Sequence, residues 1–431
     1  MKARNPILPL DCYCPDGEPH FINGELFVYP SWDINPKGYC TNELHVARSK
    51  DLCNWTVSEK TFCSDKLLDW EIEFAPMAGL PEANSYKELP NYIRDYFKVP
   101  IIPFKWLKAY LNWIAKLMMG TKETRLLYAP DSLTIGDKSY LFFCTSDGQE
   151  GVATSNNPAG PFENPVRITL DKSGEPISGI DPAVFKDDDG KVYLYWGQIY
   201  AYAGELTDDL TKVKEDTLVK GTLTEKEHCF HEGSSMRKRN GIYYYVFADT
   251  HRNRPTALGY ATSKSPLGPF TYQGIIIDNF GCDPKTWNNH GSMECVNGQW
   301  YIFYHCSTGN SRYRRRMRAE PIYFDDNGLI KEVKPTSIGM GDPYKKSEPL
   351  FGYQACQVSK KAYILDDVLV AEKGKSEVVY RYIDKSCLDI SSISYEGSGD
   401  AKLDFKINND GELTIYINTK KRIEIKYFTI K

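Results

Sequence analysis

Apolar and polar residues alternate in short runs along most of the chain, a pattern that predicts β-strands. Five segments share one order: an apolar strand, a turn with Asn, Asp or Gly, and a second strand rich in tyrosine. They begin at Pro19, Pro130, Pro182, Gly233 and Gly291. The turn glycines of the last four, Gly136, Gly190, Gly241 and Gly298, follow one another at intervals of 54, 51 and 57 residues. This period, with four short strands per repeat, predicts the blades of a β-propeller.

The first two repeats are twice as far apart, because 112 residues separate Gly24 from Gly136. Between about 69 and 125 the spacing of apolar residues becomes helical. The apolar stripe consists of Trp106, Leu107, Tyr110, Leu111, Ile114, Leu117 and Met118, with Lys105, Lys108 and Lys116 elsewhere on the helix. We therefore expect a helical insertion between the first and second blades. It is expected to pack on the propeller; a lid over the mouth, a homo-oligomer contact and a membrane surface are the alternatives.

After Asp342 the pattern changes to alternating segments such as ELTIYIN from Glu412, which predict short antiparallel strands of a β-sandwich. The expected fold is all-β. It comprises a five-bladed β-propeller over 1–345, with the helical insertion at about 69–125, and a small β-sandwich-like domain over 346–431. This last domain either binds sugar or supports the propeller.

Composition and charge exclude several classes. A net charge of −4 without a sustained basic field makes nucleic acid an unexpected partner. The chain contains no run of eighteen apolar residues, so the sequence predicts no membrane-spanning helix. Its start lacks the apolar core of a secretory signal. A cytoplasmic location is therefore expected. The twelve cysteines contain no CxxC pair, which favours free thiols over a disulfide framework or a zinc site.

A polar residue stands just ahead of four of the five inner strands, eight or nine residues before the turn glycine. These residues are Asp16, Asp181, Glu232 and His290. A propeller brings the starts of its inner strands to one mouth of the central channel, so these side chains are expected to meet there. Clustered carboxylates repel one another and have a cost in stability, which favours a chemical role. Glycoside hydrolysis uses such a pair, one carboxyl protonated and the other ionised.

Four motifs resemble glycoside hydrolase family 43: CPDGEPHF from Cys14, YAPD from Tyr128, IDPAVFKDDDGKVYLYWG from Ile180 and HEGSSMRKRNGIYYY from His231. The resemblance covers roughly residues 8 to 345 and implies a five-bladed, inverting enzyme that needs no cofactor for its chemistry. It assigns the general base to Asp16 and the general acid to Glu232. It makes Asp181 the residue that modulates the pKa of the acid and orients it.

The resemblance also implies that His290 helps to hold a calcium ion in the channel through water; a histidine satisfied by hydrogen bonds is the alternative. An arginine directed toward the sugar falls on Arg315 or Arg316, and Asp131 falls on the Ala-Pro-Asp motif. The full set of substrate-contact candidates is Trp32, Asp33, Asp131, Trp196, Arg315 and Arg316. For Trp196, packing in the core is the competing interpretation.

The predicted function is that of an exo-glycosidase acting on terminal furanosyl or xylosyl residues of plant-type carbohydrates. PDGEPHF resembles furanosidase subgroups, so α-L-arabinofuranosidase is preferred to β-xylosidase or β-galactofuranosidase. A retaining fructan-cleaving enzyme would share the Asp-Pro motif and a Glu-Cys pair such as Glu294-Cys295, but its Asn-Asp-Pro-Asn motif is missing near the start. A non-catalytic sugar-binding propeller is the alternative from another class. Two features depart from the family: an insertion of about 57 residues, and Tyr128 in place of tryptophan.

Overall fold

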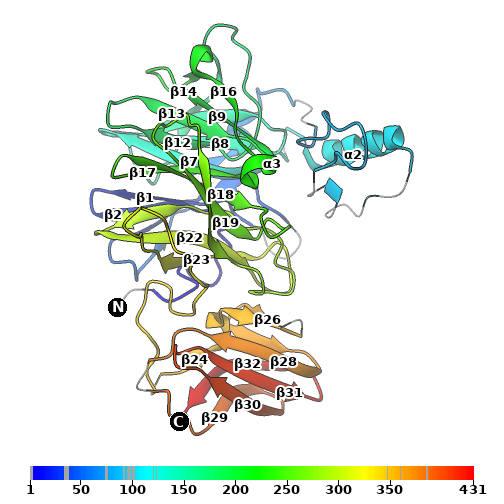
Figure 1. The fold of residues 1–431 in the computed structure, drawn as a ribbon, viewed down its shortest axis with the longest axis vertical. Coiled ribbons are helices and arrows are strands. Elements are labelled where there is room, and N and C mark those ends of the chain that lie inside the picture. The colour runs from blue at the N-terminus through cyan, green and yellow to red at the C-terminus, as the bar shows by residue number, and fades with distance from the viewer. Residues whose placement is uncertain are drawn as a thin grey trace.

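The computed structural model describes residues 3–33, 38–72, 76–90, 93–94, 99, 102–119, 121–122, 124–346, 348–359, 361–384 and 387–431. Five antiparallel sheets in these ranges form the blades of a propeller, and each blade begins with its innermost strand. Figure 1 shows the blades in one body above the C-terminal domain, with the insertion at one side. The prediction of an all-β fold with a helix between the first two blades is confirmed.

The first blade contains β1 (Glu18–Ile22), β2 (Glu25–Tyr29), β4 (Ala47–Ser49) and β5 (Thr56–Val57). The second contains β7 (Leu127–Ile135), β8 (Lys138–Thr145), β9 (Glu150–Ser155) and β10 (Glu163–Arg167). The third contains β12 (Ala183–Lys186), β13 (Val192–Trp196), β14 (Tyr200–Glu205) and β16 (Val219–Thr224). The fourth contains β17 (Phe230–Arg239), β18 (Ile242–Asp249), β19 (Ala257–Ser263) and β20 (Thr271–Asp278). The fifth contains β21 (Met293–Val296), β22 (Gln299–Ser307) and β23 (Arg315–Pro321).

Shorter elements join the blades. Strand β3 (Glu43–Leu44) pairs with β6 (Phe62–Cys63), and β11 (Thr169–Leu170) pairs in parallel with β15 (Lys212–Val213). Two 3-10 helices, η2 (Ser64–Leu67) and η3 (Glu215–Thr217), and the short helix α3 (Glu225–His228) lie in the connections. Of the inner strands, β1 contacts both β7 and β21, and β12 contacts β7 and β17. The first and last blades are therefore neighbours, and the ring is closed.

The tyrosine-rich second strands account for the core, which lies between the blades. Strand β13 is buried along its whole length, and β18 is buried at all but its first residue. Tyr195 and Tyr245, from the third and fourth blades, meet edge to face with ring centroids 5.3 Å apart. Similar apolar clusters separate every pair of neighbouring blades. These strands are apolar on both faces because neighbouring blades cover both faces of each sheet.

The hairpins inside the blades use the turn chemistry that the sequence predicts. Asn240 and Gly241 join β17 to β18 with φ of 51° and 72°, and Asn297 and Gly298 join β21 to β22 with φ of 52° and 83°. Two consecutive left-handed residues match the twist of a two-residue hairpin, and Asn-Gly tolerates them at little cost.

The fifth blade differs from the expected four strands, because three strands form it in the described part of the chain. The free edge of β23 is instead bonded by the N-terminal segment. The amide of Ile7 donates to the carbonyl of Met317 at 3.2 Å, and Asn5 Oδ1 accepts from the amide of Ala319 at 3.0 Å. The start of the chain thus covers an edge that would otherwise expose unpaired backbone groups.

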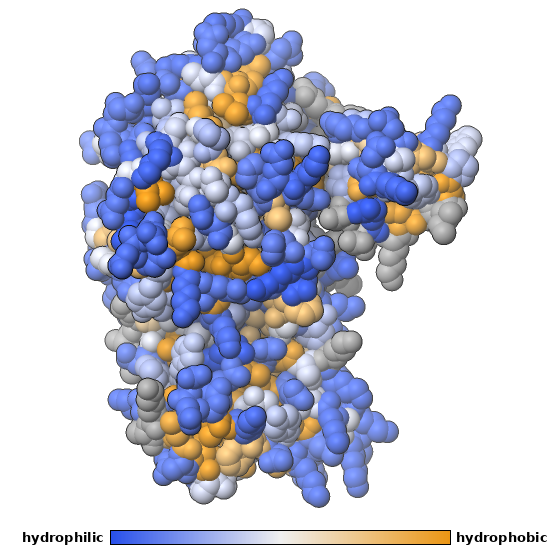
Figure 2. All heavy atoms as spheres, viewed as in Figure 1, coloured by the Kyte–Doolittle hydropathy of each residue, from blue (hydrophilic) through white to orange (hydrophobic). Residues whose placement is uncertain are grey.

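The insertion has a small core of its own. One face of α2 (Phe104–Met119) packs Leu107 and Leu111 against residues that include Leu80, Leu89 and Ile93. The side chain of Met118 lies outside the described part. Figure 1 shows α2 standing out beside the blades, and Figure 2 shows hydrophobic atoms on the surface of this lobe. Within the described ranges, none of the helices has the length and apolar content needed to cross a membrane.

Arg125 ties the insertion to the second blade. This side chain is fully buried, and its Nη2 donates to the carbonyls of Trp70 at 3.0 Å and Glu71 at 3.3 Å. Its Nε lies 3.3 Å from Asp147 Oδ1, in the turn between β8 and β9. The same turn contributes Gln149, whose Nε2 donates to the carbonyl of Glu71 at 2.6 Å.

Two sheets form the C-terminal sandwich around one apolar cluster. The first sheet contains β24 (Leu350–Phe351), β32 (Ile423–Ile430), β27 (Val368–Ala371), β26 (Ala362–Leu365) and β29 (Ile393–Ser398). The second contains β25 (Gln357–Val358), β28 (Gly374–Tyr380), β31 (Leu413–Thr419) and β30 (Ala401–Ile407). The 3-10 helix η4 (Gly352–Gln354) precedes β25. The expected boundary at 345/346 falls between β23 and β24. Backbone bonds such as Val358 N to Gly281 O at 2.9 Å join the sandwich to the propeller.

Replacing Arg125 by methionine should lower the free energy of unfolding by about 3–5 kcal/mol, because Asp147 would keep its burial and lose its cation. Lys122→Met is the matched control. It breaks the exposed pair between Lys122 and Glu71 on the same segment and should change stability by less than about 1 kcal/mol. Urea unfolding measures both. Equal losses in the two variants would contradict the anchoring role of Arg125.

Candidate active site

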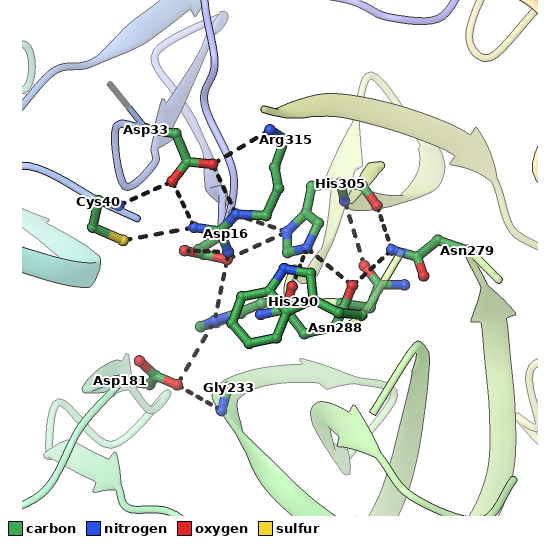
Figure 3. Close-up of polar contacts among 12 residues, drawn as sticks. Asp16, Asp33, Cys40, Asp181, Gly233, Asn279, Asn288, His290, His305 and Arg315 are labelled. Atoms are coloured by element: carbon green, nitrogen blue, oxygen red, sulfur yellow. Dashed lines mark hydrogen bonds and ion pairs between the residues drawn. The ribbon is translucent and has the colours of Figure 1, made fainter. Parts of the chain in front are cut away.

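The polar residues ahead of the inner strands meet at the channel mouth. Asp16 and Asp181 each stand two residues before their strands, β1 and β12, while Glu232 lies in β17. His290 is central: its Nδ1 is 3.9 Å from Asp16 Oδ1 and 3.8 Å from Asp181 Oδ2. Figure 3 shows Asp16, Asp181 and His290 pointing toward one another. Glu232 is near enough to act electrostatically on both Asp181 and His290. The structure therefore brings together the four residues that the repeat pattern singled out.

Asp16 and Asp181 share an unusual backbone conformation. Their φ angles are 59° and 57°, in the left-handed region that a residue with a side chain adopts rarely. Aspartate tolerates this region better than most residues, and such conformations concentrate at functional sites. The same local strain at equivalent positions of two blades turns both carboxyl groups into the channel.

Asp16 is held as an anion. Burial by itself would raise its pKa, but the Arg315 guanidinium and His305 hold the pKa of this carboxyl well below its ordinary value. Arg315 Nη1 donates to Oδ1 at 3.0 Å, and His305 Nδ1 lies 3.3 Å from the same oxygen. Asn288 fixes the histidine ring, because its Oδ1 is 3.1 Å from His305 Nε2. An ionised carboxylate in this position can take a proton from water.

Arg315 is clamped by two carboxylates. Its Nη2 donates to Asp33 Oδ1 at 2.8 Å and its Nε donates to Asp33 Oδ2 at 2.9 Å, a two-point contact that fixes the plane of the guanidinium. The amide of Cys40 also donates to Asp33 Oδ1, at 3.1 Å. Asp33 and Arg315 are both fully enclosed. Asp33, a sugar-contact candidate by sequence, is thus engaged in orienting Arg315.

Asp181 and Glu232 form the second half of the site. Burial and the carboxylates of Glu232 and Asp16 raise the pKa of Asp181 well above its ordinary value. The amide of Gly233 donates to Asp181 Oδ2 at 3.0 Å, and Gln198 Nε2 donates to Glu232 Oε2 at 2.6 Å. Burial and the neighbouring carboxylates thus favour a proton on Asp181. Glu232 is the more exposed of the two and can deliver that proton to a ligand.

Aromatic rings line one side of the mouth. Tyr39 lies with its ring 5.7 Å from Tyr128, 5.4 Å from Trp287 and 6.4 Å from Tyr313, measured between centroids. The Arg315 guanidinium stands 4.6 Å from the centroid of Tyr39. All four rings are partly exposed. Such rings suit the apolar faces of sugars.

The remaining sequence candidates lie away from the carboxylates. Arg316 donates to the backbone carbonyls of Leu10 and Asp366, so Arg315 is the arginine that faces the site. Trp196 is buried and stacks on Tyr202 at 5.6 Å, as the core interpretation predicts. Trp32 stacks on His45 with centroids 4.1 Å apart.

Asp131 lies deeper in the channel than the mouth. Its Oδ1 is 2.6 Å from His20 Nε2, and its Oδ2 accepts from the amide of Val184 at 2.7 Å. His20 and Val184 follow Asp16 and Asp181 by four and three residues, which places Asp131 below them. Its contacts in this position are structural.

Calcium in the channel does not fit the residues below His290. Glu18, His20 and Asp131 bring three potential ligand atoms together, but each already has a protein partner. Ser235 Oγ contacts Ser292 Oγ and donates to Glu18 at 2.9 Å, which closes the channel there. The Arg237 guanidinium lies 2.8 Å from Glu18 and 3.0 Å from Glu294 and supplies a cation of its own. We therefore derive no step through a metal.

Three site residues escaped sequence reasoning. His305 lies two residues before the end of the tyrosine-rich strand β22, where its neighbours are packed in the core. Tyr39 lies within the first blade, in the irregular connection between β2 and β3, with no repeat to mark it, and Gln198 lies in the short turn after Trp196. The position of Gln198 at the mouth end of β13 was the available signal, because strands of neighbouring blades end at the same rim.

Comparisons with known proteins identify the family. The model of the family described as Glycosyl hydrolases family 43 matches residues 105–330, more than half of the chain. A beta-D-galactofuranosidase of Aspergillus niger is 34% identical over 361 residues, covering 79% of this chain and 87% of that protein. A beta-xylosidase of Xylanibacter ruminicola is 31% identical over 382 residues, covering 78% of this chain and 100% of that protein.

One solved structure shares the fold over nearly the whole chain. It is an arabinoxylan arabinofuranohydrolase from Bacillus subtilis in complex with cellotetraose, with a TM-score of 0.53 and 20% identity. The match covers 99% of this chain and 97% of that one, so it includes the C-terminal sandwich. With the family match and the two relatives, the conclusion is that the chain is a glycoside hydrolase and belongs to glycoside hydrolase family 43.

Proposed function

We propose that the enzyme removes terminal furanosyl residues with inversion at the anomeric carbon, and that α-L-arabinofuranosides are its substrates. The observation that carries the proposal is the meeting of Asp16, Asp181 and Glu232 around His290. Asp16, ionised beside Arg315, accepts a proton from the attacking water. Glu232 donates the proton held by the Asp181–Glu232 pair to the leaving oxygen.

Asp181 acts on the acid in two ways in this scheme. Its protonated form, which burial and the nearby carboxylates favour, supplies a proton beside Glu232. The Gly233 amide binds Asp181 and immediately follows Glu232, so the contact also fixes the backbone that carries the acid. His290 lies between the two halves, and burial lowers its pKa, which keeps it neutral. A neutral imidazole adds no charge between Asp16 and Asp181, so it does not alter the contrast between the ionised Asp16 and the protonated acid side.

Support for a furanosyl substrate comes from the PDGEPHF motif and from the relatives. β-D-Galactofuranosides are the second candidate, because the relative that is 34% identical carries that name. Cleavage at chain ends is favoured by the insertion, which is anchored at the turn beside the mouth through Arg125 and Gln149. A panel of nitrophenyl α-L-arabinofuranoside, β-D-galactofuranoside and β-D-xyloside tests the choice. Highest kcat/KM on the xyloside would reject the furanosyl assignment.

Asp16→Asn and Glu232→Gln should each lower kcat on arabino-oligosaccharides by about 10²–10⁴-fold. On the nitrophenyl substrate the loss should be much smaller for Glu232→Gln, because a good leaving group needs little protonation. Steady-state kinetics on both substrates, with circular dichroism as the folding control, measures this difference. Unchanged activity in both variants would reject the assignment of Asp16 as base and Glu232 as acid.

The anomer first released by the wild type, followed by NMR, tests the stereochemistry. Inversion is expected if Asp16 activates water. Release of the retained anomer would reject the inverting scheme in favour of a covalent intermediate.

Replacing Arg315 by methionine should shift the acidic limb of the kcat/KM profile upward by about 1–3 pH units. The base must be ionised, and Arg315 holds the pKa of Asp16 low. Without the guanidinium, burial raises that pKa, so activity is lost at a higher pH as the solution is acidified. Arg316→Met is the control, because its contacts with Leu10 and Asp366 lie away from Asp16; it should leave the limb in place. Identical shifts in both variants would contradict this assignment.

Treatment with a chelator should leave kcat unchanged, because Arg237 supplies positive charge in the channel. Arg237→Met should lower stability by about 3–5 kcal/mol, since Glu18 and Glu294 would stay buried without their cation. Activity assays and urea unfolding measure the two effects. Loss of wild-type activity on chelation, with recovery on adding calcium, would show that a channel cation is required.

A further inference from the structure

The insertion helix α2 exposes a row of large apolar side chains. Trp106 is 68% exposed, Tyr110 40%, Trp113 57% and Leu117 64%. Positions 106, 110, 113 and 117 are spaced by four, three and four residues, so they lie on one face of the helix. The rings of Tyr110 and Trp113 stack with centroids 6.2 Å apart. The face is a continuous aromatic stripe.

The opposite side of α2 already serves the insertion's own core. Leu107 and Leu111 are fully buried, and Ala115 is nearly so. On a helical wheel this buried face is centred more than 100° from the exposed stripe. The exposed residues therefore contribute little to the stability of the insertion. Because the helix has a second apolar face that its own core does not cover, we expect that face to contact another apolar environment.

The charge of the insertion favours an anionic environment. Helix α2 contains three lysines, at 105, 108 and 116, and no acidic residue. Residues 76–122 contain seven Lys and Arg against three Asp and Glu, a net charge of +4 in a chain of net charge −4. The remainder of the chain is thus strongly acidic, and the basic excess coincides with the aromatic stripe. Lys105 is exposed at the border of that stripe.

We propose that α2 docks on the surface of an anionic lipid bilayer, with Trp106, Tyr110, Trp113 and Leu117 in the headgroup region and Lys105 beside anionic headgroups. Tryptophan and tyrosine prefer the boundary between hydrocarbon and water, and a basic helix with such a stripe lies in the interface plane. Figure 1 shows the lobe that carries α2 standing out beside the blades.

Docking in this way holds the active site near the membrane. The insertion is rooted at the turn between β8 and β9 through Arg125 and Gln149. The end of β8 in the same hairpin bears Cys144, whose Sγ accepts from the amide of Asp181 at 3.2 Å. The insertion and the backbone of Asp181 thus both contact the same end of the second blade.

Co-sedimentation with vesicles tests the proposal on the full chain. Phosphatidylcholine vesicles are compared with vesicles of phosphatidylcholine and phosphatidylglycerol at a ratio of about 3:1. Binding is expected to the anionic vesicles, weaker at high salt, and at least about tenfold weaker to the neutral ones. Trp106→Ser combined with Trp113→Ser should reduce binding more than tenfold. Lys105→Gln should reduce it about fivefold.

Tyr323→Ser is the matched control, because Tyr323 is 63% exposed but lies in the propeller; it should bind vesicles like the wild type. Hydrolysis of a nitrophenyl glycoside and circular dichroism should be unchanged in all these variants. If the double variant fails to fold, Lys105→Gln decides. Asp16→Asn should bind vesicles normally, so a failure of the proposed catalysis is distinguishable from a failure of docking.

Three results would overturn the proposal. One is the absence of sedimentation of the wild type with any vesicle. Another is a dimer, detected by light scattering, that is lost in the double tryptophan variant while vesicle binding is absent. The third is retention on insoluble arabinoxylan that depends on the two tryptophans and occurs without vesicle binding. The second would assign the stripe to self-association and the third to a polysaccharide.

Discussion

The contact between Arg315 and Asp16 joins the last blade to the first, and the geometry of the site depends on it. The guanidinium lies between Asp16 and Asp33, and the three groups are buried together. A buried ion pair is a poor source of net stability, because desolvation opposes the attraction, but removal of one partner leaves an uncompensated charge. The role of this ion pair is to position the Asp16 carboxylate. It keeps Asp16 ionised in a dry channel, and it requires that the ring be closed in one register.

The other half of the site uses the opposite electrostatic arrangement. Asp181 and Glu232 have hydrogen-bond donors but no guanidinium, so burial and the nearby carboxylates raise the pKa of Asp181. Two carboxyl groups of the same chemical type thus have different protonation states because a single arginine lies near one of them. Deeper in the channel, Arg237 applies the same principle to Glu18 and Glu294. Arg315 at the mouth and Arg237 deeper in the channel thus each neutralise the carboxylates beside them.

The sequence predicted the parts of this structure that repeat. Blades, turns and the four mouth residues are found because each recurs at a fixed offset from a turn glycine. Residues without a repeat were missed or left undecided. Arg315 and Arg316 are adjacent on one strand, so their side chains leave on opposite faces, and the register of β23 decides which one enters the site. Tyr39 reaches the mouth from an irregular connection. The N-terminal segment at the edge of β23 was also unpredicted, because the residues it pairs with are more than 300 positions away.

That closure has a consequence for how the molecule is made. Asp16 emerges among the first residues of the chain, and Arg315 follows 299 residues later. Contacts over such a separation form late, because the loop they close is long. Until the fifth blade has been synthesised, Asp16 lacks its partner Arg315 and the N-terminal segment lacks the β23 edge to which it bonds. Catalytic competence is therefore the last property that the propeller acquires, and the appearance of activity during refolding reports ring closure rather than the formation of individual blades.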